Sequence, residues 1–364
     1  MPLATELFDY TLPEGQVALT PAARRDHSRL LVVDRGSREV SHGVFADLPS
    51  LLKPGDCLFR NNASVIRGRL RAVRPGGGGV ECLLVAKAAD EAQDGNSELW
   101  RCLVRPGRKL PAGARFAHPD GLFACVVLER ERDGAAMVRF STRDGDPVAA
   151  VAARVGEVPL PPYLGRRDAS QSALDRDRYQ TVYADPSRPV AAAAPTAGLH
   201  FTSGLLASLA ARGIQTSDIT LNVGLGTFQP ISTDTIEAHP IHRERYEIPA
   251  LSQRRLFPPL PGRRIAVGTT SARAIEDFLG SQAAPGDGVH RAEAAIYLYP
   301  PRRFAGVDAL ITNFHQPRST LLCLVSAFLT PGETGGIAWL REIYADAIGR
   351  GYRFYSYGDA MLIL

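Results

Sequence analysis

The feature that most constrains the fold is a change in sequence pattern between about residues 64 and 155. Six short runs of alternating or continuous apolar residues occur there, separated by turn signals such as RPGGGG, DGN, PDG and RDGD. The runs are SVIRGRLRAV, GVECLLVAKA, ELWRCLVR, GARFAH, LFACVVLERE and AAMVRFST. Strands at roughly ten-residue spacing with hairpin turns predict a small antiparallel barrel or sandwich.

The flanking segments mix strand and helix patterns. Residues 29–34 (RLLVVD) and the run CLFRNN predict buried strands, with a helix between them in GVFADLPSLLKPGD. Farther along, helices are expected at about 203–212 and 271–280, alternating with the strand candidates SDITLNVG, RRIAVGTT and VDALITNF. This alternation is typical of an α/β layer with a partly parallel sheet.

We therefore predict an α/β plus β fold in which a barrel interrupts a layered domain. The discontinuous α/β domain comprises residues 1–62 and 156–364, and the inserted six-stranded antiparallel β-barrel domain comprises residues 63–155. The chain has 364 residues, of which 45% are hydrophobic, so it holds enough apolar material for more than one core.

Composition also predicts where the protein works. No run approaches the roughly 18 apolar residues of a membrane-spanning helix, and the amino terminus has no basic-then-apolar signal layout. The five cysteines are odd in number and widely spaced, which favours reduced thiols over a disulfide framework or a zinc ribbon. We expect a monomeric cytoplasmic protein without a membrane partner. Its net charge of +4 permits a nucleic-acid partner without identifying one.

Small and polar residues crowd the predicted ends of several apolar strands. In IAVGTTSARAIE, the hydroxyls of Thr269, Thr270 and Ser271 stand at a helix start, where they either cap free amides or help to hold an anion. Arg273 follows one turn later and either reaches that anion or lies in solvent. Both interpretations remain open from the sequence.

Two further segments each place a histidine among small or polar residues. AAPTAGLHF contains Thr196, Gly198 and His200, and LITNFHQPR contains Thr312, Asn313 and His315. Each histidine is either a satisfied structural side chain or a proton-transfer group. Near the carboxyl terminus, Asp359 precedes an apolar end and is either a cap or a site acid.

The segment EAHPIHRERYEI supplies His239, His242 and Glu244. Its HxxHxE spacing suggests a metal site, but Pro240 prevents a normal helix across the histidines, so we expect no metal there.

The segment LNVGLGTFQPI contains Asn222, Gly224, Gly226 and Thr227. A dinucleotide fingerprint needs a third glycine where Gln229 stands, which argues against a nicotinamide oxidoreductase.

Taken together, these segments resemble the S-adenosylmethionine:tRNA ribosyltransferase-isomerase family of queuosine biosynthesis. The resemblance covers nearly the whole chain, in order. The matching blocks are PLPPY, DRYQTVYA, AAPTAGLHF, VGLGTFQPI, HPIHRERYEI, AVGTTSARAIE, TNFHQPRSTLLCLVSAF and YRFYSYGDAMLI. Upstream, SRLLV, HGVFADLPSLLKPGD and WRCLVRPGRKLPAG fit as well.

The resemblance implies an α/β domain interrupted by a six-stranded barrel, and it implies no metal. The implied reaction transfers and isomerises the ribosyl part of S-adenosylmethionine onto 7-aminomethyl-7-deazaguanine in tRNA, giving epoxyqueuosine with release of adenine and methionine. S-adenosylmethionine would then be a ribosyl-donor substrate rather than a bound cofactor.

That chemistry needs groups that accept and donate protons. The sulfonium acidifies the adjacent 5′-carbon for a positioned base, and adenine must be protonated or hydrogen-bonded as it leaves. Histidine suits such transfers near neutral pH, so we expect His200 and His315 to be catalytic, with Asp359 and Glu244 as partners. The residues expected to bind substrate are Thr196, Gly198, Asn222, Gly224, Gly226, Thr227, His239, His242, Thr269, Thr270, Ser271, Arg273, Thr312 and Asn313.

The chain departs from the family pattern in two blocks. NNASVIRGR carries Ala63-Ser64 where members usually have Thr-Arg, and Arg67-Gly68 where they have Pro-Ala. Asn222 stands where members usually have histidine, and asparagine cannot shuttle a proton. These changes leave an alternative open: a divergent relative that uses the same ribosyl donor but a free deazapurine or another small acceptor. An RNA-binding module without catalysis is a third possibility from another class.

Overall fold

The computed structural model describes residues 2–88, 97–131, 134–165, 168–189, 193–224, 229–258 and 261–364. The chain forms two compact units. The first comprises Met1–Ala63, Thr181–Asp185 and Pro195–Leu364, and the second comprises Ser64–Gln180 and Pro186–Ala194. The first unit contains a mixed α/β sheet and the second a closed barrel, so the predicted fold class is confirmed. The finer domain boundaries, at residues 62/63 and 155/156, stay a prediction.

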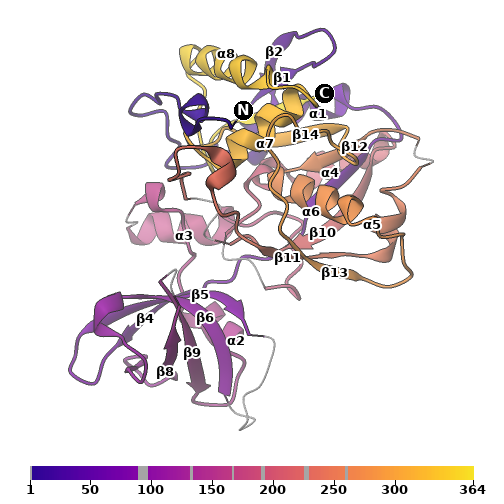
Figure 1. Ribbon diagram of the computed structural model, residues 1–364. Coiled ribbons are helices and arrows are strands. Elements are labelled where there is room, and N and C mark those ends of the chain that lie inside the picture. The colour runs from indigo at the N-terminus through magenta and orange to yellow at the C-terminus, as the bar shows by residue number, and fades with distance from the viewer. Residues whose placement is uncertain are drawn as a thin grey trace. The chain divides into compact units, whose positions relative to one another are not determined.

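The first unit is built on a nine-stranded sheet with the order β13-β11-β10-β3-β12-β14-β15-β1-β2 (Figure 1). The four central strands β10, β3, β12 and β14 are mutually parallel, whereas β15 is antiparallel to β14. Their bounds are β1 Arg29–Val33, β2 Val40–Val44, β3 Cys57–Asn61, β10 Gln215–Leu221, β11 Glu244–Ile248, β12 Arg264–Val267, β13 His290–Ala294, β14 Ala309–Asn313 and β15 Ala360–Ile363.

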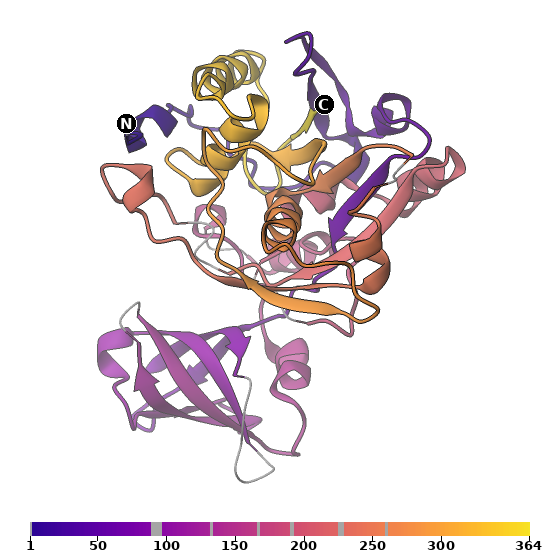
Figure 2. The same ribbon diagram turned by 45° about the vertical axis from the view of Figure 1, so that its right-hand side comes forward.

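The middle of this sheet is buried on both faces, which explains why its strands read as short continuous apolar runs. In β14 all five residues are buried, and β12 is buried from its second residue onward. Figure 2 shows β3, in purple, beside β10, in salmon, although all six barrel strands lie between these two strands in the sequence.

Helices cover both faces of the sheet. Side chains of α1 (Leu48–Leu51) and α4 (Ser203–Ala211) join one core with residues of β1, β12, β14 and β15. Helix α6 (Thr269–Gly280) packs against β10, β3 and β12, and α5 (Ala250–Arg254) against β10. Helix α7 (Thr320–Leu329) packs against α6 and α8 (Gly336–Gly349).

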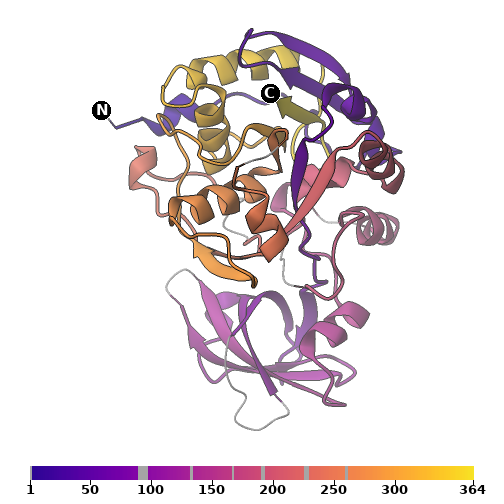
Figure 3. The same ribbon diagram turned by 90° about the vertical axis from the view of Figure 1, so that its right-hand side faces the viewer.

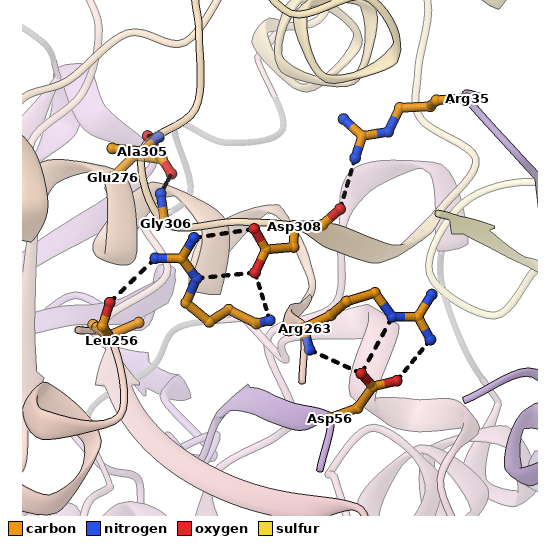
Figure 4. A network of polar contacts seen from close by, with 9 residues as sticks. Arg35, Asp56, Leu256, Arg263, Glu276, Ala305, Gly306 and Asp308 are labelled. Carbon is orange, nitrogen blue, oxygen red and sulfur yellow. Dashed lines mark hydrogen bonds and ion pairs between the residues drawn. The ribbon is translucent and has the colours of Figure 1, made fainter. Parts of the chain in front are cut away.

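Ion pairs close the amino edge of the parallel strands (Figure 4). Asp56 precedes β3 and accepts hydrogen bonds from Arg263 Nη2 at 2.6 Å and Nε at 3.2 Å. Asp308 precedes β14 and accepts from Arg264 Nε at 2.9 Å and Nη2 at 3.0 Å. The Arg35 guanidinium donates to the Asp308 carbonyl at 2.6 Å. Each pair ties the start of one strand to the start of a neighbouring strand.

The second unit contains the barrel, with the closed strand order β4-β5-β6-β9-β8-β7 (Figure 3). Its strands are β4 Arg69–Val73, β5 Gly79–Lys87, β6 Ser97–Arg105, β7 Arg115–Ala117, β8 Phe123–Arg130 and β9 Ala135–Thr142. Inward-facing residues such as Leu70, Trp100 and Phe140 form its core. Helices α2 (Val148–Val155) and α3 (Ala169–Arg178) follow the last strand. All six predicted strands are therefore confirmed.

The arginines of β4 have acidic partners, Glu81 on strand β5 and Glu157 after helix α2. Arg69 Nη1 lies 3.1 Å from Glu81 Oε1, and Arg71 Nη2 lies 3.2 Å from Glu157 Oε2. All five cysteines are free thiols, as their spacing predicts. None of the described helices is long and apolar enough to cross a membrane.

One predicted helix is shorter than expected. Residues 43–56 form only the end of strand β2, a 3-10 turn at Phe45–Asp47 and the single helical turn α1. The Asp47 carboxylate accepts a hydrogen bond from the Val44 backbone at 3.0 Å, which fixes the start of the 3-10 turn directly after β2. Pro54 and Gly55 prevent the helix from continuing beyond α1. Strands β2, β11 and β13 lie at or near the sheet edges, and their polar sequences gave no clear apolar signal.

Candidate active site

The carboxyl ends of the parallel strands gather the predicted site residues at one edge of the sheet. Asn222 follows β10, Gly268 follows β12, and Asn313 ends β14. Because β15 runs antiparallel to β14, Asp359 at the start of β15 comes to the same edge. Ligands of open α/β sheets bind at this edge, outside the carboxyl ends of the strands.

His200 lies at this edge with both ring nitrogens hydrogen-bonded. Its Nδ1 lies 2.7 Å from Ser28 Oγ, and its Nε2 lies 3.1 Å from Asn313 Nδ2. An amide nitrogen can only donate, so Nε2 accepts and Nδ1 carries the proton. Burial, and to a smaller extent the positive charges of Arg353 and Arg25, lowers the pKa of His200 to about 3. His200 is therefore a neutral, firmly held histidine.

Asn313 and Asp359 extend this hydrogen-bonded cluster. The Asn313 amide also donates to the carbonyl of Tyr355 at 3.2 Å. The Asp359 carboxylate accepts from the backbone nitrogens of Arg29 at 2.9 Å and Arg353 at 2.8 Å. Asp359 is 1% exposed, and through these two hydrogen bonds its carboxylate links two chain segments at this edge of the sheet.

His315 differs from His200 because one of its ring nitrogens is unoccupied. Nε2 lies 2.8 Å from Thr312 Oγ1, while Nδ1 has no hydrogen-bond partner among the described residues. The backbone is fixed by Tyr344, whose hydroxyl accepts from the His315 nitrogen at 2.9 Å, and by Tyr10, whose hydroxyl donates to the His315 carbonyl. Burial lowers the pKa of His315 to about 3, so the ring is neutral at physiological pH.

A second group of predicted residues lines one cavity of about 520 Å³, including its solvent-open mouth. The predicted residues that line it are His239, His242, Glu244, Thr269, Thr270 and Arg273. Apolar side chains make much of the remaining wall: Ile241, Ile296, Leu298, Leu321 and Leu324. Concave, largely apolar sites with a few polar groups are typical of small-molecule binding. His200 and His315 do not line this cavity.

The ion pair of Glu244 and Arg273 forms one wall of the cavity. Arg273 Nη1 donates to Glu244 Oε2 at 2.5 Å, and the two side chains are only 12% and 4% exposed for Arg273 and Glu244 respectively. The same guanidinium donates to the carbonyls of Ile296 at 3.1 Å, Ala294 at 2.9 Å and His242. Glu244 Oε1 accepts from the backbone of Gly224 at 2.9 Å. Arg273 is thus held within the protein in this structure.

The start of α6 presents hydroxyls with different partners. Ser271 Oγ donates to the Val267 carbonyl at 2.9 Å, so this hydroxyl serves the helix itself. Thr270 Oγ1 is buried and has no partner among the described residues. Gly268 caps the helix with φ +90°, which glycine adopts without strain. Thr196 and Gly198 belong to the short 3-10 helix Thr196–His200, which packs beside β14. The predicted residues Gly226 and Thr227 lie outside the described residues.

His239, in the cavity wall, also has a ring nitrogen without a hydrogen-bond partner among the described residues. Its Nδ1 is buried without a partner among the described residues, and its ring lies 6.4 Å from that of Tyr297. Burial lowers the pKa of His239, and the charge of His242 lowers it further. Sequence reasoning missed Tyr297, which lines the cavity; its segment AIYLYPP, where aromatic residues precede two prolines, was the available signal.

The positions that depart from the family pattern take ordinary structural contacts. Ala63 is fully buried, and Arg67 Nη1 donates to the Ala153 carbonyl at 3.0 Å. The Asn222 backbone donates to the Arg245 carbonyl at 2.9 Å. Among the residues described, no group of three or more histidine, cysteine, aspartate or glutamate side chains is arranged to hold a metal.

Comparison with known proteins identifies the family of this chain. The chain matches the family described as "Queuosine biosynthesis protein" over residues 5–363. The S-adenosylmethionine:tRNA ribosyltransferase-isomerase of Gloeobacter violaceus is 46% identical over 367 residues, which cover 99% of this chain and 96% of the relative. The enzyme of the same name from Anaeromyxobacter dehalogenans is 45% identical over 360 residues, 98% of each chain.

A solved structure gives the same result. The crystal structure of S-adenosylmethionine tRNA ribosyltransferase from Thermotoga maritima is 31% identical, with a TM-score of 0.52, and the match covers 98% of this chain and 100% of that one. The sequence resemblance, the fold and the relatives agree along the whole length. This chain belongs to the S-adenosylmethionine:tRNA ribosyltransferase-isomerase family of queuosine biosynthesis.

Proposed function

We infer that this chain is a transferase-isomerase that moves the ribosyl part of S-adenosylmethionine onto 7-aminomethyl-7-deazaguanine in tRNA. The product is epoxyqueuosine, and adenine and methionine are released. The observation that carries this inference is the near-complete match to relatives of that name, one of which is 46% identical over 99% of this chain.

We propose that the cavity beside α6 binds the adenine and methionine parts of the ribosyl donor. Its apolar wall and the ring of Tyr297 suit a planar base, and the neutral His239 offers a nitrogen to hydrogen-bond it. The Glu244–Arg273 pair supports the wall because its guanidinium fixes three backbone carbonyls. S-adenosylmethionine is consumed here as a substrate rather than kept as a cofactor.

We assign proton transfer to histidines with an unoccupied nitrogen. His315 and His239 have one each, and burial lowers both pKa values, so both rings are unprotonated at neutral pH. His200 instead positions Asn313, because both of its nitrogens are already bonded. Asp359 holds the segments around this pair.

The decisive experiment is mass spectrometry of the acceptor after incubation with S-adenosylmethionine. One reaction contains tRNA carrying 7-aminomethyl-7-deazaguanine, and a second contains only the free deazapurine. We expect adenine release and a ribosyl-sized mass gain on the tRNA alone. Turnover with the free base alone would instead support the small-acceptor alternative, and tRNA binding without adenine release would support a non-catalytic RNA-binding protein.

We further propose that the protein acts as a monomer in the cytoplasm, where tRNA is modified. Size-exclusion chromatography with light scattering measures the mass in solution. A mass near 39.3 kDa supports the monomer, and twice that value contradicts it.

A further inference from the structure

Three buried hydroxyls without hydrogen-bond partners lie around the segment Ala197–Gly198. Tyr183 Oη, Thr181 Oγ1 and Thr270 Oγ1 are each buried and unpaired among the described residues. Polar atoms buried in a protein are nearly always hydrogen-bonded, and leaving them unpaired costs stability. Several such atoms in one place therefore indicate that a ligand normally supplies their partners.

The glycines of this region show how close the hydroxyls are to the segment. A Cβ atom on Gly198 would lie 2.0 Å from Tyr183 Oη and 2.7 Å from the methyl group of Thr181, whose hydroxyl is bonded to the same carbon as that methyl. A Cβ atom on Gly268 would lie 3.5 Å from Thr270 Oγ1 and 3.6 Å from the Ala197 side chain. The small residues at 197 and 198 therefore let the Tyr183 hydroxyl approach the segment from one side, while the Thr270 hydroxyl lies near Ala197 on the other.

The neighbouring cations are already paired, so the hydroxyls face a neutral group. The Arg60 guanidinium lies 4.6 Å from the centre of the Tyr183 ring, but its Nε donates to Asp218 at 2.6 Å. Arg273 is held by Glu244. A carboxylate or phosphate would need a free positive charge, whereas neutral hydroxyls match the paired hydroxyls of a sugar.

We propose that Tyr183, together with Thr181 and Thr270, binds the ribose hydroxyls of the sulfonium nucleoside. Thr270 also lines the cavity beside α6, so one molecule can place its sugar against these hydroxyls and its remaining parts in the cavity. This assignment rests on the proposed function, since that function supplies the nucleoside. It makes Tyr183 a binding residue that fixes the sugar during ring opening.

The test removes one oxygen atom and keeps the ring. Tyr183→Phe retains the contacts of the ring with Arg60 and with Phe201, whose ring centre lies 6.1 Å away. Calorimetry on the full chain measures the Kd for S-adenosylmethionine and for its 2′-deoxy and 3′-deoxy analogues. We expect the variant to bind S-adenosylmethionine about five- to twentyfold more weakly. One of the two analogues lacks the ribose hydroxyl that Tyr183 contacts, so wild type should bind it weakly and Tyr183→Phe should bind it no more weakly than wild type does.

A stability measurement separates binding from a structural role. Because the Tyr183 hydroxyl is unpaired without ligand among the described residues, Tyr183→Phe should keep or raise the Tm of the free protein. Tyr246→Phe is the matched control: its hydroxyl donates to Asp277 at 3.0 Å, so that variant should lose stability and keep its affinity. If Tyr183→Phe fails to fold, Thr181→Val tests the same cluster.

The outcomes distinguish this inference from the function on which it rests. Unchanged affinity of Tyr183→Phe and Thr181→Val for S-adenosylmethionine, with wild type binding normally, would overturn the ribose assignment and leave the proposed function standing. If wild-type protein binds no S-adenosylmethionine with or without acceptor tRNA, the proposed function fails and the ribose assignment fails with it.

Discussion

The Glu244–Arg273 pair gives the sharpest prediction, because both charged side chains are buried against each other. Arg273→Met removes the guanidinium that contacts the Glu244 carboxylate, which is 4% exposed. Breaking a buried pair from one side typically costs about 3–5 kcal/mol. The three carbonyls that Arg273 fixes lose a donor as well. We therefore expect a loss of unfolding free energy in the upper half of that range.

A double-mutant cycle tests the pairing itself. Glu244→Gln keeps the shape of the side chain and its hydrogen bond from the Gly224 backbone. In the Arg273→Met, Glu244→Gln double variant, a neutral amide therefore replaces the unpaired buried carboxylate of the Arg273→Met single variant. Its loss should be smaller than the sum of the single losses by about 1–3 kcal/mol. Urea unfolding of the four proteins measures this coupling. Additive losses would refute the reasoning that the two charges stabilise each other.

Four further predictions concern catalysis, packing and pH. His315→Gln should lower kcat by about 10²–10⁴-fold with little change in Kd for S-adenosylmethionine, and an unchanged kcat excludes it as the proton-transfer group. Gly198→Ala should cost about 1–3 kcal/mol in urea unfolding, because its Cβ would meet Tyr183 Oη at 2.0 Å; wild-type stability would contradict the close contact. The pKa of His200 is about 3 in the folded protein and 6.5 ordinarily, so between pH 3 and 6.5 the unfolded chain binds a proton there and the folded protein does not. Stability should therefore fall on acidification below about pH 6.5, by about 1.4 kcal/mol per pH unit for this group, and His200→Gln should flatten that slope in urea titrations. Burial alone would raise the pKa of Asp308, but the hydrogen bonds from Arg264 outweigh burial and hold this pKa below 3.8. The ion pair therefore stabilises the fold above about pH 4, and this stabilisation is lost as the pH falls through the pKa of the folded protein. Asp308→Asn should reduce stability at pH 7 and lose less than wild type on acidification below about pH 4, and parallel unfolding curves for the two proteins would contradict this.

The sequence predicted those parts of the fold whose signals are local. Alternating strands with tight turns identified all six barrel strands, and apolar runs identified β1, β3, β10, β12 and β14. Strand β2 was not predicted, and its last two residues were assigned to the following helix, because an exposed edge strand lacks a continuous apolar run. Strand ends also indicated which residues share one edge of the sheet, since parallel strands bring their carboxyl ends together.

Partners distant in sequence could not be predicted from the chain alone. Nothing around Arg273 indicates that Glu244 holds it, and nothing around His200 indicates that Ser28 and Asn313 occupy both ring nitrogens. The sequence left open whether each histidine is structural or chemical. The hydrogen bonds distinguish the two rings: both nitrogens of His200 have partners, whereas Nδ1 of His315 has none among the described residues.

The two edges of the central sheet have consequences for how variants of this enzyme would behave under selection. Arg263–Asp56 and Arg264–Asp308 anchor one edge, while Tyr183, Thr181 and Thr270 leave polar atoms unmatched toward the other. Replacing one of these hydroxyls, which lack hydrogen-bond partners among the described residues, by a methyl group or a hydrogen should raise the Tm of the free protein. A screen for heat resistance alone would then collect substitutions around Ala197–Gly198 that fold better and turn over more slowly, whereas changes that reinforce the anchored edge should raise heat resistance without that penalty.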